Sequence, residues 1–229
     1  MPSLRIGGLA RLSTCDWPGE LVATLFCQGC GWDCAYCHNP HLIPARSHME
    51  LTWEAVLTFL EERRGLLDGV VFSGGEPLLQ PALAEAISIA RDLGYRIALH
   101  TNGQLPERLA AVLPQLDWVG LDVKAPFADY ESVTGIAGSG LPAEASLRLL
   151  LEAGLPYEVR TTVHSSLLGE DQLRALADEL RAAGVRRWVL QPYRAEGTRC
   201  ERLPGASKPL GSELIQELRS GFEEFEIRE

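Results

Sequence analysis

Short apolar runs alternate with helix-periodic segments along almost the whole chain. Six runs have the length and composition of buried strands: residues 20–27, 69–73, 95–101, 117–124, 156–164 and 187–193. Between them, apolar residues recur at the spacing of an amphipathic helix. The clearest such faces are Leu83, Ala86, Ile87 and Ala90, and Leu173, Leu176, Ala177 and Leu180. Repeated strand–helix units predict a parallel sheet covered by helices.

Glycines mark the ends of the predicted helices. Gly94, Gly154 and Gly184 each follow a helical pattern and precede a strand, as helix-terminating glycines do. Right-handed crossovers would curl the sheet, so the predicted fold class is α/β, a partial (β/α)6 TIM-type barrel. We expect one domain over residues 1–229, with a core at about 15–195 and a C-terminal helical extension at about 205–229.

The residues whose side chains could bind a ligand or react lie where the predicted strands end. They occupy segments 30–37, 73–77, 100–103, 122–124, 160–164 and 191–194. In a parallel barrel, the loops at the C-terminal ends of the strands carry the chemistry. We therefore expect these six segments to share one rim.

Composition narrows the class of protein. The 229 residues include 21 basic and 31 acidic ones, a formal net charge of −10, which argues against general nucleic-acid binding. The N-terminus lacks an apolar signal core, and no apolar run is long enough to cross a bilayer. These features predict a cytoplasmic protein with no membrane and no nucleic-acid partner. Thiols stay reduced in the cytoplasm. We therefore expect the six cysteines to be metal ligands and buried thiols instead of disulfides, with structural roles for Cys15 and Cys200.

Three cysteines stand close together in a C-x3-C-x2-C run, Cys30, Cys34 and Cys37. Cluster irons normally have four thiolates, and a closed zinc site also has four ligands. Three thiolates without an obvious fourth therefore favour an iron–sulfur cluster with one open iron. Cys27 leaves a four-cysteine zinc site or closed cluster as alternatives. It ends an apolar run, however, and we expect it to be a small buried side chain.

Other candidate ligand groups follow the later strands. The Gly-Gly-Glu-Pro turn at 74–77 carries little side chain, so its carbonyl oxygens could approach a ligand such as an ammonium group. Lys124 and Arg160 could hold a carboxylate, and Asn102 could bind a ribose or an amino acid. Each of these features is also compatible with an ordinary turn or a satisfied polar group at a strand end.

The cysteine run and the Gly-Gly-Glu-Pro turn together resemble the radical S-adenosylmethionine superfamily over roughly residues 5–195. Within that range, Asp16-Trp17-Pro18-Gly19, the run 26–40 ending in Cys-His-Asn-Pro, and Leu-Asp-Val-Lys at 121–124 look like the glycyl-radical-enzyme activases. The likeness is greatest to the longer activating proteins of anaerobic ribonucleoside-triphosphate reductase.

This resemblance implies cofactors and site residues. Cys30, Cys34 and Cys37 would bind three irons of one [4Fe-4S] cluster per chain, and the open iron would chelate S-adenosylmethionine. The backbone of the glycine turn would receive the amino group of that cofactor. The implied cofactor-binding residues are Tyr36, Gly74, Gly75, Glu76, Asn102, Lys124 and Arg160. No catalytic residue beyond the cluster and cofactor is implied.

The resemblance also implies a reaction and partners. An electron from flavodoxin or ferredoxin would cleave S-adenosylmethionine, and the 5′-deoxyadenosyl radical would take a hydrogen atom from a glycine of the reductase. Alternative targets are another glycyl-radical enzyme, of the pyruvate formate-lyase type, and a small molecule. A non-catalytic iron–sulfur or zinc module is the alternative of another class.

Three histidines need separate interpretation. Related activases often have an acidic residue before Thr-Asn-Gly, where this chain has His100, which we interpret as a satisfied strand-end histidine. His38 and His41 adjoin the cysteines. Neither is expected to be a metal ligand, because a fourth protein ligand would close the open position.

Overall fold

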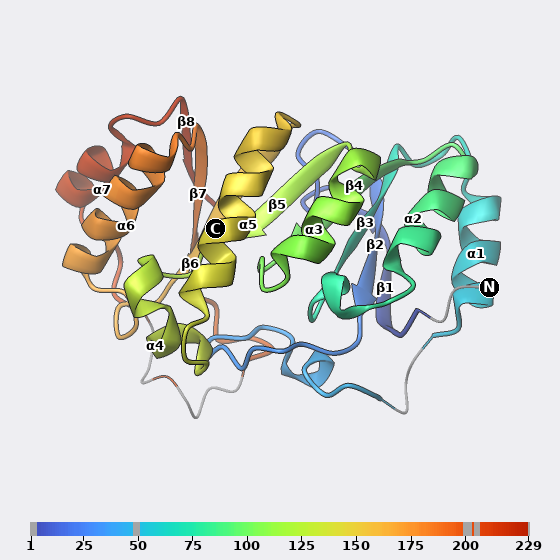
Figure 1. Cartoon of the computed structure of the whole chain (residues 1–229), viewed down its shortest axis with the longest axis horizontal. Helices are drawn as coiled ribbons and strands as arrows, with labels where there is room; N and C mark the ends of the chain where they lie inside the picture. The colour runs from blue at the N-terminus through green and yellow to red at the C-terminus, as the bar shows by residue number, and fades with distance from the viewer. Residues whose placement is uncertain (1–3, 48–50, 199–202, 204–206, 229) are drawn as a thin grey trace. The chain divides into compact units, whose positions relative to one another are not determined.

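The computed structural model describes residues 4–47, 51–198, 203 and 207–228. Its eight-stranded sheet follows chain order from β1 to β8 (Figure 1). The strands are β1 (Ile6–Ser13), β2 (Val22–Cys27), β3 (Gly69–Gly74), β4 (Arg96–Thr101), β5 (Trp118–Asp122), β6 (Tyr157–Val163), β7 (Arg187–Pro192) and β8 (Glu224–Ile227). The α-helices are α1 (Trp53–Glu62), α2 (Leu83–Asp92), α3 (Pro106–Val112), α4 (Tyr130–Thr134), α5 (Gly140–Ala153), α6 (Glu170–Ala183) and α7 (Ser212–Arg219).

All six predicted strands are present, as β2 to β7, with ends that differ by no more than two residues. Strand β2 pairs in parallel with β3, β3 with β4, and β6 with β7. The predicted alternation of parallel strands and helices is therefore confirmed. Within the described ranges, every helix is too short or too polar to cross a membrane.

Two strands were not predicted. Strand β1 pairs antiparallel with β2, and β8 pairs in parallel with β7. Gly7 and Gly8 interrupt the side-chain alternation of β1, since glycine offers nothing to pack in a strand. Strand β8 has the sequence Glu-Phe-Glu-Ile, and such charged short strands are typical of sheet edges. The predicted helical extension therefore contains α7 but ends in a strand.

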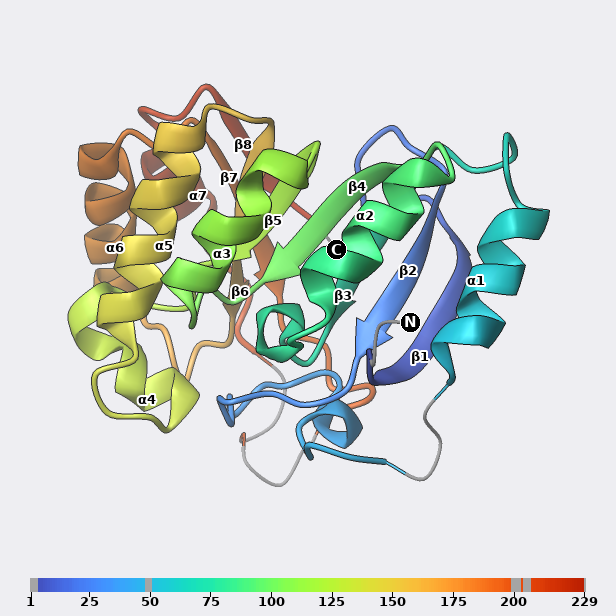
Figure 2. The same cartoon turned by 45° about the vertical axis from the view of Figure 1, so that its right-hand side comes forward.

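The chain divides into two compact units. The first comprises the described residues of Met1–Gly31, His41–Thr101 and Leu105–Gly120. Its strands β2 and β3 are almost entirely buried, and α2 and α3 run alongside β3 and β4 (Figures 1 and 2). The predicted apolar face of α2 is wholly buried, as a helix covering a sheet requires.

The second unit comprises the described residues of Trp32–Pro40, Asn102–Gln104 and Leu121–Glu229. In this unit α6 and α7 lie side by side (Figure 2), and the predicted apolar face of α6 is wholly buried. The expected helix-ending glycines, Gly154 and Gly184 here and Gly94 in the first unit, all have positive φ angles.

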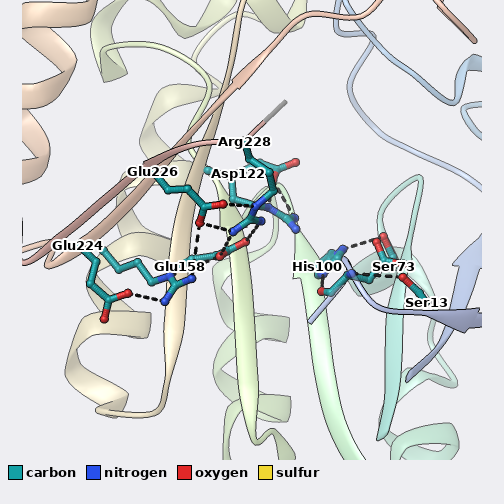
Figure 3. A network of polar contacts seen from close by, with 11 residues as sticks. Ser13, Ser73, His100, Asp122, Glu158, Glu224, Glu226 and Arg228 are labelled. Carbon is teal, nitrogen blue, oxygen red and sulfur yellow. Dashed lines mark hydrogen bonds and ion pairs between the residues drawn. The ribbon is translucent and has the colours of Figure 1, made fainter. Parts of the chain in front are cut away.

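A buried ion pair fixes β8 in the second unit. The Glu158 side chain on β6 is 1% exposed, and the Arg228 guanidinium donates to both of its carboxylate oxygens at 2.8 and 3.0 Å. Arg228 also donates to Glu226, as Figure 3 shows, and Arg187 Nε lies 3.5 Å from Glu158 Oε2. A buried carboxylate needs such partners because desolvation penalises its charge. The residue after β8 therefore ties the last strand to the middle of this unit.

Replacing Arg228 should destabilise the protein strongly. Arg228→Met leaves Glu158 buried with one incomplete partner, and we expect the free energy of unfolding to fall by about 3 kcal/mol. The matched control is Arg186→Met, because Arg186 is 68% exposed and lies 4.0 Å from an equally exposed Glu223. That change should cost at most about 0.5 kcal/mol. Denaturant unfolding measures both, and equal small losses would contradict the assignment.

Candidate active site

The Gly-Gly-Glu-Pro turn packs directly against the segment that leads to the first cysteine. Gly75 N donates to Cys27 O at 2.9 Å, and Glu76 N donates to Gly29 O at 2.8 Å. Gly74 has φ +119°, and a Cβ there would overlap the Cys27 backbone. A Cβ on Gly75 would overlap Gly29 O. Glycine is required at both positions because backbone meets backbone, and the turn's carbonyl oxygens are what it could offer a ligand.

The Glu76 side chain serves the turn itself. It is fully buried, and its Oε1 accepts from Leu78 N at 2.9 Å and from Thr101 Oγ1 at 2.8 Å. The carboxylate therefore caps the 3-10 turn Pro77–Leu79. A cofactor role for Glu76 would fall to its backbone, which is the role that the resemblance implies.

Two glutamines that the sequence analysis did not single out shape the cysteine loop. Gln28 is 1% exposed, and its Nε2 donates to His41 O at 3.0 Å and to Pro44 O at 2.7 Å. Gln80 Nε2 donates in turn to Gln28 O at 2.6 Å. These bonds fasten the two ends of the loop to each other. The sequence signal that could have pointed to Gln28 is its place directly after an apolar strand.

His100 is a satisfied strand-end histidine, as interpreted from the sequence. Its Nδ1 lies 3.2 Å from Ser73 Oγ, a pair visible in Figure 3, and its Nε2 lies 2.7 Å from Asp16 O. Because a carbonyl oxygen only accepts, Nε2 carries the proton. His100 thus holds the Asp16 backbone, and the Asp16 carboxylate accepts from Thr24 Oγ1 at 2.6 Å.

The cysteine loop continues in the second unit, where α4 holds it. Asp33 N donates to Thr134 O at 3.2 Å, and Ala35 N donates to Val133 O at 3.1 Å. Carbonyls at the C-terminus of a helix have no partner within the helix. Helix α4 therefore offers ready acceptors, and its acceptors order the part of the loop that contains Cys34.

Cys34, Tyr36 and Lys124 form a buried group in the second unit. Lys124 Nζ lies 5.6 Å from the centre of the Tyr36 ring. Burial raises the pKa of the Cys34 thiol, and the Lys124 ammonium acts in the opposite direction. Burial would lower the pKa of Lys124, but interactions with Tyr36, Asp122 and Cys34 outweigh it and hold this pKa well above its ordinary value. Lys124 is therefore a cation at neutral pH.

Asp122 brings Lys124 and Arg160 together. Asp122 Oδ1 accepts from Arg160 Nε at 2.9 Å, and Asp122 Oδ2 lies 3.4 Å from Lys124 Nζ. The two cationic side chains are 10% and 8% exposed, whereas the carboxylate is 35% exposed. Lys124 and Arg160 thus form one cationic pair, joined by Asp122.

Asn102 is also buried. Its Oδ1 accepts from Gln104 N at 3.0 Å and so helps to shape its own turn.

The remaining cysteines differ from one another. Cys27 is fully buried, which confirms the expectation, and burial strongly raises the pKa of its thiol. Cys15 was expected to be a buried structural thiol, and this was wrong: it is exposed in the connection between β1 and β2. Cys200 lies outside the described residues.

The three motif cysteines have the donor chemistry that an iron–sulfur cluster requires. Every described cysteine is outside a disulfide, so Cys30, Cys34 and Cys37 are thiols that can become thiolate ligands. Cys30 belongs to the first unit, and Cys34 and Cys37 belong to the second. Among the described residues, no three His, Cys, Asp or Glu side chains are already arranged around a metal position. The Tyr36 Oη within this loop is buried without a hydrogen-bond partner in the described part of the chain.

Comparison with known proteins identifies related sequences. A model of the radical SAM superfamily matches residues 24–180, which include the cysteine run, the glycine turn and Lys124. A Methanocaldococcus jannaschii protein, provisionally named as a glycyl-radical enzyme activating enzyme, is 25% identical over 91% of this chain and 88% of its own. The pyruvate formate-lyase-activating enzyme of Clostridium pasteurianum is 31% identical over 84% of this chain and 83% of that enzyme.

Solved structures show the same fold. Streptococcus suis SuiB, bound to its precursor peptide SuiA, matches with a TM-score of 0.64 at 13% identity. The match covers 88% of this chain and 47% of SuiB, so this chain spans about half of that longer protein. Together with the family match, it confirms the predicted α/β fold of the partial-barrel type.

A side chain on the second glycine of the turn should destabilise the protein. In Gly75→Ala the new Cβ overlaps Gly29 O and lies 2.9 Å from Leu42 O, and neither backbone atom can swing away. We expect the free energy of unfolding to fall by about 1–3 kcal/mol. Gly8→Ala is the control, since its Cβ meets the Phe26 side chain at an ordinary 3.6 Å. Chemical denaturation compares the two, and a Gly75 variant as stable as the Gly8 variant would contradict the close packing.

Proposed function

Because the chain belongs to the radical SAM superfamily, we propose that it is a glycyl-radical-enzyme activase that reductively cleaves S-adenosylmethionine. The proposed target is the glycyl-radical subunit of an anaerobic ribonucleoside-triphosphate reductase, and the proposed electron donor is a flavodoxin or ferredoxin. Two relatives named as activating enzymes support the general activity. The Asp-Trp-Pro-Gly segment at 16–19 and Cys-His-Asn-Pro at 37–40 support the reductase as target.

One observation carries the proposal. The glycine turn at 74–77 is bonded through Gly75 and Glu76 to the backbone of the segment that ends in Cys30. The Cys30 thiol and the two glycines of the turn are thereby held on adjoining backbone in one unit. A cofactor that must touch a cluster iron while its amino group meets backbone carbonyls needs this proximity.

The residues would divide the work by chemical type. A [4Fe-4S] cluster held by Cys30, Cys34 and Cys37 would supply the electron that cleaves the sulfonium of S-adenosylmethionine. Carbonyl oxygens of the glycine turn would accept from the cofactor's ammonium group, which has only donors to offer. Tyr36 would pack beside the cysteines as a buried aromatic side chain.

Lys124, Arg160 and Asn102 would bind the rest of the cofactor. Lys124 and Arg160 are buried cations that already bind one carboxylate, that of Asp122. The carboxylate of the cofactor could bind to the same two cations. Asn102 would offer its amide group to the ribose or amino-acid part. Burial of these groups strengthens their attraction for an anion, because water screens it less.

A pyruvate formate-lyase type of target is the second candidate. It is favoured by the Clostridium pasteurianum enzyme, which is 31% identical over most of both chains. The residues discussed above are those expected to bind cofactors, and cofactor binding is common to both candidates. Only an experiment with the two partners can separate them.

The cysteines give the first test. After anaerobic reconstitution with iron and sulfide and reduction, the parent protein should convert S-adenosylmethionine to 5′-deoxyadenosine. Cys34→Ala should abolish both the intact cluster and product formation, since it removes a ligand. Cys27→Ala is the matched control and should leave both largely in place, because Cys27 is a fully buried side chain on β2. Equal loss of iron in both variants, with no binding of S-adenosylmethionine by the parent, would instead support a four-cysteine binding module.

The target gives the second test. The reduced, reconstituted protein is incubated with S-adenosylmethionine and either the reductase or the lyase from the same source, and glycyl radical is counted by electron paramagnetic resonance. We expect a radical on the reductase and none on a reductase whose acceptor glycine is replaced by alanine. A signal confined to the lyase would replace the proposed target and keep the activase chemistry.

A further inference from the structure

Lys124 is an unusual choice of residue for its place. Only two of the 21 basic residues are lysines, Lys124 and Lys208. Lys208 is exposed, as expected for this strongly hydrated cation, whereas the Lys124 side chain is only 8% exposed. A lysine offers a compact point charge where arginine would offer a planar fork. Lys124 therefore places a compact charge in a confined space.

The ammonium of Lys124 faces the cysteine loop. Its Nζ lies 5.6 Å from the centre of the ring of Tyr36, the residue directly before Cys37. Cys34, two positions before Tyr36, is buried as well. The Lys124 backbone is fixed as well, because its N–H and the Tyr130 hydroxyl lie 3.0 Å apart. A buried cation is thus held in a defined place against Tyr36, which lies in the segment that carries Cys34 and Cys37.

Asp122 compensates this charge only in part. Its Oδ2 lies 3.4 Å from Lys124 Nζ, beyond the usual range of a charge-assisted hydrogen bond. The same carboxylate accepts from Arg160 at 2.9 Å and is 35% exposed to solvent. Its negative charge is therefore shared with a closer cation and weakened by water. The charge of Lys124 is therefore only partly neutralised, and it lies against Tyr36 of the cysteine loop.

We propose that Lys124 is a positioning residue for charge, whose ammonium raises the reduction potential of the cluster held by Cys30, Cys34 and Cys37. This role rests on the proposed function, because it requires the cysteines to hold a cluster. Reduction adds one electron to a thiolate-ligated, anionic group, so a nearby fixed cation stabilises the reduced form more than the oxidised form. The effect is separate from any contact between Lys124 and S-adenosylmethionine, and it operates before that cofactor binds.

The test measures the potential in the absence of S-adenosylmethionine. Four proteins are reconstituted and their iron and sulfide are counted: the parent, Lys124→Met, Lys124→Arg and Lys208→Met. Each is then titrated with a reductant, and the reduced cluster is followed by electron paramagnetic resonance. Lys124→Met keeps most of the length of the side chain and removes its charge, and it should lower the midpoint potential. We expect at least a tenfold change in the reduction equilibrium, equivalent to about 59 mV for one electron. Lys124→Arg should restore most of the shift, and Lys208→Met should match the parent.

Each result decides the proposal. A lower potential in Lys124→Met that Lys124→Arg restores supports it. An unchanged or higher potential in Lys124→Met, or an equal drop in both Lys124 variants, overturns it. If Lys124→Met fails to take up a cluster, uptake by Lys124→Arg supports a role of the charge, and failure of both assigns Lys124 a packing role instead. A parent protein that takes up no cluster overturns the proposed function itself, and this inference with it.

Discussion

The polar backbone of the cysteine loop is the constraint on which the rest of the site depends. In its described residues 28–47 this loop has no strand and no α-helix, so no regular ladder satisfies its N–H and C=O groups and each needs an individual partner. In the first unit, Gly29 N therefore bonds to Leu42 O at 2.7 Å. In the second unit, Asp33 N donates to the carbonyl oxygen of Thr134 in α4. The loop acquires its shape from bonds within itself, as at Gly29, and from bonds to a regular element, as at Asp33.

The same constraint explains why the neighbouring side chains are so small or so specialised. Backbone that must bond to backbone leaves no room for a Cβ, and this is the situation of Gly75 against Gly29. Where charges are buried, they are handled in two different ways. Glu158 is held bidentately by Arg228, a closed arrangement suited to holding a strand in place. Lys124 has a looser partner, and its charge remains available to the cysteines.

Much of this fold could be predicted from local patterns. Buried parallel strands are continuous apolar runs and covering helices have a regular apolar stripe, so β2 to β7 and the faces of α2 and α6 were found. Strand β1 was missed because Gly7 and Gly8 erase its pattern, and β8 because its register depends on a partner, β7. The exposure of Cys15 had a local signal, since its neighbours Ser13, Thr14 and Asp16 are polar, but the prediction for Cys15 did not use it.

The candidate site was predictable to the extent that chemistry dictates residue type. The spacing of the thiols and the two glycines of the turn are local features of the sequence. The family model that matches residues 24–180 confirms the superfamily that these features indicated. The bonds of Arg160 to Asp122 join residues 38 positions apart, and those of Gln80 to Gln28 join residues 52 apart. No local pattern encodes such pairs.

Cofactor chemistry and choice of target therefore have different sequence requirements. This chain shares its fold with SuiB at 13% identity, so the fold tolerates the replacement of most residues. The thiols, the glycine turn and the buried cations of this chain involve only a few of its residues. Recognition of a protein partner depends on exposed residues, whose replacement costs little stability. Those residues can diverge while the buried ones stay, so a sequence specifies its cofactor chemistry more strongly than the enzyme on which that chemistry acts.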